Sequence, residues 1–220
     1  MDTQEQSKTS LETSANVRVG RELLKATAPY AVESVNRSWR LVASTFVLLI
    51  LAMCLAAFAP TWPVRLLFSL LTALLMVRTF ITYHDYMHGA ILSRSRLAWL
   101  LFHAYSTLSL TPPRSWRASH NYHHGHVGQI SDAGVGAFPI MTTRMWREAS
   151  RTSRLRYRMV RHPITVLTGY FTIFFLNISL LPLLTNPLRH WDSLLVLFGH
   201  GALIATLWIF GGFDTVFFVI

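Results

Sequence analysis

LVASTFVLLILAMCLAAFA, residues 41–59, is a run of nineteen residues without a charge. About twenty apolar residues suffice for a helix to cross the hydrocarbon core of a bilayer. The segment PTWP at 60–63 then predicts a tight turn, after which VRLLFSLLTALLMVRTFITY at 64–83 forms a second apolar stretch. Together these segments predict a transmembrane helical hairpin.

Two further apolar stretches follow a long polar region. PITVLTGYFTIFFLNISLLPLL and WDSLLVLFGHGALIATLWIFGGF are each long enough to cross a bilayer as a helix. The predicted fold is therefore all-α: a polytopic membrane protein with two transmembrane hairpins, and hence four spans. The spans are predicted at about 41–59, 64–83, 163–184 and 191–213.

The polar parts of the chain divide into two regions. Residues 1–38 are predicted to be an N-terminal segment ahead of a membrane domain at 39–220. The region 84–163 is predicted to form a helical cap, in which LAWLLFHAYSTLSL at 97–110 is too short to span and is expected to be half-buried or re-entrant. Asp214 is expected near the cap-side end of the fourth span, either paired or at the interface.

Composition agrees with a membrane protein and argues against a nucleic-acid-binding one. Charged residues make up 14% of the chain, whereas soluble domains carry about 25%. The net charge of +10 is typical of membrane-protein loops, and no soluble basic face with aromatic or helix-turn-helix readout accompanies it. The single cysteine, Cys54, excludes an internal disulfide framework.

The distribution of arginines predicts the orientation of the chain in the membrane. The region 84–163 carries eleven arginines and no lysine, whereas the connection between the third and fourth predicted spans offers only Arg189. Because cytoplasmic loops are enriched in basic residues, the N-terminus and the cap are predicted to be cytoplasmic.

Histidines gather in two clusters near the predicted membrane boundary. His84 and His88 are four residues apart, and His120, His123 and His124 repeat the i, i+3, i+4 spacing that places side chains on one helical face. Because His123 and His124 are adjacent, one of them must turn aside. Five imidazoles at this depth need partners, and they exceed the ligands of one tetrahedral zinc. An isolated histidine pair is more often incidental, but two clusters favour a two-metal site, with an iron pair able to handle dioxygen.

The two clusters resemble the histidine boxes of a known family. HDYMHG at 84–89 is similar to the first box, HxxxH, of integral-membrane fatty acid desaturases and related hydroxylases. TPPRSWRASHNYHHGHVG at 111–128 is similar to the second box, HxxHH, and RLRYRMVRHP at 154–163 resembles the basic segment before the third span. The resemblance implies a four-helix membrane bundle with a cytoplasmic cap and a non-haem di-iron centre. The implied iron ligands are His84, His88, His120, His123 and His124.

The same resemblance implies a reaction and its partners. The family removes two hydrogens from a fatty acyl chain with O2, drawing electrons from a ferredoxin or a b-type cytochrome, among membrane lipids. It also has a third HxxHH box after the fourth span, which this sequence lacks, so the chain is expected to be C-terminally truncated and inactive alone. Two alternatives stay open: a related lipid or carotenoid hydroxylase or ketolase, and a catalytically inactive membrane protein.

Other polar residues are candidates for supporting roles. Asp85 is expected to orient His84 by accepting its second N–H, and three further residues could contact the ligands: Asn121, His126 and Asp132. His200 is an ionisable residue inside a predicted span and hence a functional candidate, but its depth argues against metal ligation. The arginine-rich run at 144–161 predicts either a helix on anionic lipid head groups or a docking surface for an acidic electron donor.

Overall fold

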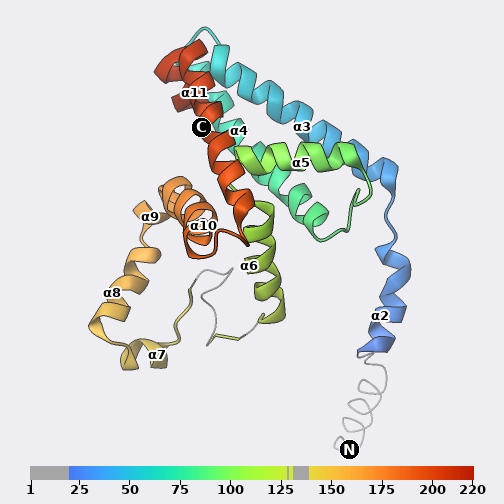
Figure 1. The fold of residues 1–220 in the computed structure, drawn as a ribbon, viewed down its shortest axis with the longest axis vertical. Helices are drawn as coiled ribbons and strands as arrows, with labels where there is room; N and C mark the ends of the chain where they lie inside the picture. Colours follow the sequence, from blue (N-terminus) through green and yellow to red (C-terminus); the bar gives the residue numbers. More distant parts are fainter. Residues whose placement is uncertain (1–19, 128, 131–138) are drawn as a thin grey trace, which may run out of the picture.

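The computed structural model of the protein describes residues 20–127, 129–130 and 139–220. Within these ranges every regular element is a helix and there is no strand, which confirms the predicted all-α class. A short helix, α2 (Arg21–Thr27), and a 3-10 turn, η1 (Ala28–Ala31), precede the first long helix. Figure 1 shows the long helices gathered at one end of the molecule and most of the shorter ones at the other.

The predicted hairpin is formed by α3 (Val35–Phe58) and α4 (Trp62–Met87). The two helices pack through small and aliphatic side chains, among them Leu49, Ala52 and Leu75. Pro63 lies in the first turn of α4, where its missing N–H costs no intrahelical bond. The helix α4 continues one turn beyond the predicted boundary, so His84 and Asp85 lie on the same rigid rod that crosses the membrane.

The third long apolar helix is α11 (Trp191–Val219), which has a kink at Gly212, where φ is 71°. It begins beside α6 and ends beside the start of α4 (Figure 1), where Asp214 lies 4.0 Å from Arg65. Asp214 was predicted at the cap-side end of its helix, and that prediction is wrong. The start of α4 is the end opposite to His84, so α11 runs away from the histidines along the bundle.

The predicted span at 163–184 is helical but not continuous. It consists of α9 (Pro163–Leu167), the π-helix η2 (Tyr170–Leu180) and α10 (Leu181–Thr185). Pro182 cannot donate to the carbonyl of Ile178, and the Ser115 hydroxyl donates to that carbonyl at 2.8 Å instead. Among the described residues, α3, α4 and α11 are long and apolar enough to cross a membrane. Because α11 begins beside α6 on the histidine side, the segment 163–184 does not lead to the opposite face, and it does not form the predicted second hairpin with α11.

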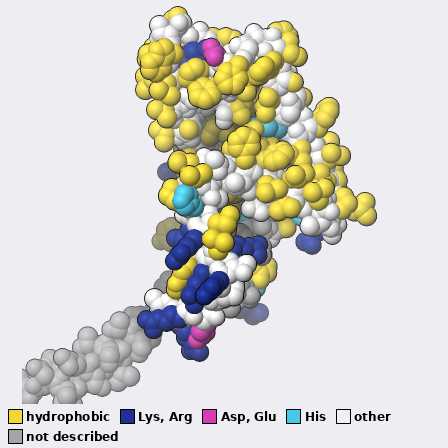
Figure 2. All heavy atoms as spheres, turned by 90° about the vertical axis from the view of Figure 1, so that its left-hand side faces the viewer, with side chains coloured by type: hydrophobic (Ala, Val, Ile, Leu, Met, Phe, Trp, Pro, Cys, Tyr) yellow, Lys and Arg dark blue, Asp and Glu magenta, His cyan; other side chains and the backbone are white. Residues whose placement is uncertain are grey.

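The outer faces of the long helices are apolar. Leu48, Ile50 and Leu51 on α3 are about half exposed, and hydrophobic side chains cover the upper part of the molecule in Figure 2. In water so large an apolar surface would drive association, whereas in a bilayer it is the expected surface. The chain is an integral membrane protein.

The cap side contains α5 (Arg96–Leu108), α6 (Pro113–Gly125), α7 (Thr143–Glu148) and α8 (Arg151–Val160). As expected for a half-buried segment, α5 buries Ala98 and Phe102 and exposes Leu97 and Trp99. The main core joins α3, α4, α5 and α6, and its members are Val42, Tyr83, Met87, Leu92, Ala98, Phe102, Tyr105 and Trp116. This core includes residues of α4 and α6, the two helices that carry the histidines, and it fixes the relative position of these helices.

Candidate metal centre

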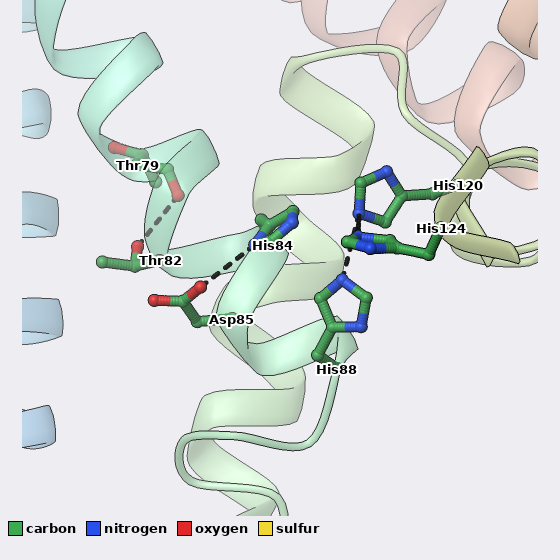
Figure 3. Close-up of polar contacts among 7 residues, drawn as sticks. All are labelled: Thr79, Thr82, His84, Asp85, His88, His120 and His124. Atoms are coloured by element: carbon green, nitrogen blue, oxygen red, sulfur yellow. Dashed lines mark hydrogen bonds and ion pairs between the residues drawn. The ribbon is translucent and has the colours of Figure 1, made fainter. Parts of the chain in front are cut away.

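Four histidines from two helices converge at one point. His84 lies in the last turn of α4 and His88 caps that helix, while His120 and His124 lie one turn apart on α6. One ring nitrogen of each lies within 4.8 Å of the others. Figure 3 shows the four rings pointing toward a common centre between the helices. The structure therefore brings together the two sequence clusters, which are separated by more than thirty residues.

The distances within the group are short enough for shared coordination. The Nε2 atom of His120 lies 3.0 Å from Nε2 of His88 and 2.9 Å from Nε2 of His124. Two nitrogens about 3 Å apart can both reach one ion at the usual metal–imidazole distance of about 2.1 Å. The ring of His84 completes the cluster, with its centroid 4.6 Å from that of His88 and 4.7 Å from that of His120.

Two neighbours hold the rings in place. Oδ1 of Asp85 lies 3.0 Å from Nδ1 of His84, the contact expected from the sequence (Figure 3). This contact leaves Nε2 of His84 as the nitrogen available to a ligand. Trp116, which is 6% exposed, stacks on His120 with ring centroids 4.3 Å apart and an interplanar angle of 20°.

The group suits a transition metal. Burial, followed by the neighbouring histidines, lowers the pKa of His120 to about 4, and burial together with His84 lowers the pKa of His88. At neutral pH both imidazoles are therefore uncharged, which is the form that binds a metal. Neutral nitrogen donors without a carboxylate in the group favour iron, zinc, copper or nickel over calcium or magnesium. The residues present thus fit the iron that the desaturase resemblance implies.

His123 lies outside this group of four. Its ring centroid is 6.3 Å from that of His120 and 6.0 Å from that of His124, so of the two adjacent histidines it is His123 that turns aside. Its assignment as an iron ligand stays a prediction.

The other supporting candidates are less closely placed. His126 stacks on Tyr122, with centroids 3.9 Å apart, and its Nδ1 donates to the Tyr122 carbonyl at 2.8 Å, away from the four rings. Asn121 is exposed on α6. Asp132 falls outside the described residues. Among the described candidates, Asp85 thus contacts the group, through Nδ1 of His84.

Four hydrogen bonds fix the start of α6 and the two residues that precede its N-cap, Leu110 and Thr111. The carbonyls of Leu110 and Thr111 accept from Ser179 at 2.9 Å and Tyr83 at 3.0 Å. The Ser115 hydroxyl donates to Ile178, and the backbone N–H of Arg114 donates to Oδ2 of Asp192 at 2.7 Å. Sequence reasoning missed Asp192. Its signal was an acidic residue at the very start of an apolar stretch, but its partner lies 78 residues away.

His200 contacts other helices and not the histidine group. Its Nδ1 donates to the Thr107 carbonyl at 2.9 Å, and its Nε2 accepts from the Tyr170 hydroxyl at 2.7 Å. His200 therefore joins α11 to α5 and η2. It is not one of the four converging histidines. Two other histidines have local contacts: His103 donates to the Trp99 carbonyl, and His162 caps α9.

An apolar cavity of about 420 Å³ runs along α4 from Ser69 to Phe80, one turn before His84, and is bounded by α5, η2 and the end of α11. Its lining includes Met76, Tyr105, Phe174 and Phe80. Phe80 also packs edge-on against Trp116, with centroids 5.9 Å apart, and Trp116 stacks on His120. Two aromatic rings thus join the cavity wall to the histidine group.

Sequence comparisons with known proteins find fatty acid desaturases. A "Fatty acid desaturase" from Bacillus subtilis is 28% identical over 110 residues, which is 50% of this chain and 31% of that protein. An "sn-1 acyl-lipid omega-3 desaturase (ferredoxin)" from Synechocystis sp. is 29% identical over 112 residues, with the same two shares. The matched region thus covers about a third of these curated relatives. No solved structure matches the chain.

The family profile gives the broadest match. The profile described as fatty acid desaturase covers residues 60–220, which include both histidine clusters, the arginine-rich run and all of α11. A match over this much of the chain shows membership. The chain belongs to the fatty acid desaturase family.

Proposed function

We propose that the protein is an O2-dependent desaturase that introduces a carbon–carbon double bond into a fatty acyl chain held in a membrane. The observation that carries the proposal is the convergence of His84, His88, His120 and His124, one helical turn of α4 beyond an apolar cavity. Family membership supports the same conclusion and makes an oxidoreductase the expected enzyme class.

The four converging histidines would hold iron, with His123 as a fifth candidate ligand. Iron bound there supplies the activation of O2 that removal of hydrogen from an unactivated C–H bond requires. Four nitrogens within 4.8 Å are a ligand set for one ion, so a di-iron centre needs donors beyond these four.

The residues of this chain would bind, orient and exclude water. Asp85 fixes the ring orientation of His84 and keeps its Nδ1 proton in place. Phe80 lines the cavity and packs on Trp116, which stacks on His120, so these two rings join the cavity wall to the histidines. An acyl chain that extends from the cavity past these rings toward the histidines would be positioned by packing alone, since the contribution required of the protein is positioning.

The partners proposed are an acyl substrate and an external electron donor. The Synechocystis relative is named as an acyl-lipid desaturase that uses ferredoxin, so an acyl-lipid and a ferredoxin are the first candidates. An acyl thioester and a b-type cytochrome are the second. We further propose that residues 39–220 form the membrane domain, with the N-terminus and both histidine clusters in the cytoplasm.

The test is expression in a host that lacks desaturases, followed by mass spectrometry of its fatty acids and iron analysis of the purified protein. We expect a product two mass units lighter than its substrate, as loss of two hydrogens requires. His120→Ala should abolish both product and iron, whereas His103→Ala, the matched control outside the group, should keep both.

Three outcomes would contradict the proposal. Full iron loading and product formation by His120→Ala would show that the four converging histidines take no part in the reaction. A product heavier by one oxygen atom would identify a hydroxylase, and absence of any product with a loaded centre would identify an inactive metal-binding protein.

A further inference from the structure

The helices α7 and α8 are unusually rich in arginine. Residues 144–161 contain seven arginines and one glutamate. Neither helix has a buried residue, and Arg144 pairs with Glu148 at 2.9 Å. Figure 2 shows arginine side chains gathered below the apolar body of the protein, with hydrophobic side chains between them. This surface, defined as residues 144–161, carries a net positive charge that attracts an anionic partner.

The surface also exposes an apolar strip. Leu155 and Met159 are four residues apart on α8, which places them on one helical face, and they are 58% and 60% exposed. By the same helical spacing, Arg151 and Arg158 border this strip on one side and Arg156 on the other. A helix with large apolar side chains between arginines is the pattern of helices that lie in a membrane interface.

The two helices are braced against each other. Arg154 donates to the carbonyls of Trp146 at 2.8 Å and Arg147 at 2.7 Å. The guanidinium groups of Arg154 and Arg158 lie over the Trp146 ring, at 5.8 Å and 5.2 Å from its centroid. The face that carries Leu155 and Met159 is therefore presented as a fixed surface, and little rotamer or backbone freedom is lost when it binds.

The chain continues from this surface into apolar sequence. After α8, the short helix α9 exposes Ile164 and Leu167, which are 63% and 85% exposed, and the apolar π-helix η2 follows. The arginine-rich surface therefore lies where the chain passes from polar to apolar surroundings. An acidic soluble protein would match the charge of this surface but would leave its apolar strip in water.

We propose that α8 and α9 lie in the head-group layer of an anionic phospholipid leaflet. Leu155 and Met159 insert among the acyl chains, while Arg151, Arg156 and Arg158 bind the head-group phosphates. This contact is independent of the histidine centre, so it holds whether or not the protein is a desaturase.

The test uses a single fluorescent label on the whole chain. Cys54→Ser removes the one cysteine, and Leu155→Cys then accepts an environment-sensitive dye. The labelled protein is reconstituted in nanodiscs of phosphatidylcholine, with or without roughly 30% phosphatidylglycerol to supply the negative surface potential. We expect the dye in anionic nanodiscs to be quenched by spin-labelled lipid and protected from aqueous iodide, and high salt to reverse both effects.

Matched variants test whether insertion depends on the charge of the arginines on α8 and not on a change in the fold. Replacing Arg151, Arg156 and Arg158 by glutamine should lower the insertion equilibrium roughly a hundredfold, since each arginine near an anionic surface contributes about a factor of five. The control replaces Arg37, Arg94 and Arg96, which are exposed on other elements, and should leave insertion unchanged. A label at Ser153→Cys, on the opposite face of α8, should stay accessible to iodide.

Two results would overturn the proposal. Equal iodide quenching at position 155 in neutral and anionic nanodiscs would show that the strip does not insert. Protection that arises only when an acidic ferredoxin is added would assign the same surface to a protein partner.

Discussion

The two ends of α6 differ sharply in how they are held. Its first turn and the residues just before it are joined by hydrogen bonds to Tyr83, Ser179, Ile178 and Asp192, which come from three other helices. Its last two turns carry His120 and His124, whose ring nitrogens contact other histidines. The protein scaffold fixes where the helix starts, and a bound metal would fix where it ends.

This difference separates two kinds of substitution. Changes at the fixed end should lower stability with or without metal, because they remove contacts made by the fold itself. Changes at the histidine end should lower only the extra stability that metal binding adds.

The largest effect is expected for Trp116→Ala. The indole is 6% exposed and contacts both the core and His120, and truncation of a buried tryptophan costs about 3–5 kcal/mol. Thermal unfolding in detergent should show a large loss of stability in the metal-free protein and a further loss of metal affinity. If the metal-free variant were as stable as the metal-free unsubstituted protein, the Trp116 side chain would not contribute to the stability of the core.

His124→Ala should have an effect that depends on metal. Without metal the change should cost less than about 0.5 kcal/mol, since the residue is exposed. With ferrous ion at a hundred times its dissociation constant, the unsubstituted protein gains about 2.7 kcal/mol, which the variant should lose. Anaerobic unfolding with and without Fe²⁺ measures both values, and the same metal-dependent gain in the variant would contradict the assignment.

Asp192→Ala should destabilise the protein in both states. The substitution leaves the Arg114 N–H without its acceptor at the buried start of α6, at a cost of about 2 kcal/mol. Asp192→Asn keeps an oxygen at the same place and should recover most of the loss. Equal losses for the two variants would show that the hydrogen bond is not what holds this end of the helix.

The smallest effect is expected for Ser179→Ala. It removes one buried hydrogen bond to the Leu110 carbonyl and should cost about 1 kcal/mol. Ser119→Ala, whose hydroxyl bonds only within α6, is the matched control and should cost less. If unfolding measurements reverse this order, the contact between η2 and α6 does not stabilise the fold.

Local sequence signals predicted much of this architecture. The stretches at 41–59 and 64–83 are uniformly apolar, so no tertiary contact was needed to expect α3 and α4. The spacing of His84, His88, His120 and His124 predicted two helical faces that could meet. Their meeting point could not be predicted, because it depends on a core shared by four helices.

Other features depend on long-range contacts that no local sequence pattern predicts. The segment at 163–184 has the hydropathy of a span, yet the Ser115–Ile178 contact and Pro182 give it a different helical path. The choice between His123 and His124 depends on the rotation of α6, which Asp192 and Tyr83 help to fix from elsewhere in the chain.

Iron stoichiometry under anaerobic conditions tests the central claim most directly. The protein is purified, loaded with Fe²⁺, desalted and analysed for bound metal, alongside the double substitution His84→Ala/His120→Ala and the control His103→Ala. We expect at least one iron per chain in the unsubstituted protein and the control, and loss of tenfold or more in the double variant. Equal iron in all three proteins would show that the four converging histidines are not the metal centre.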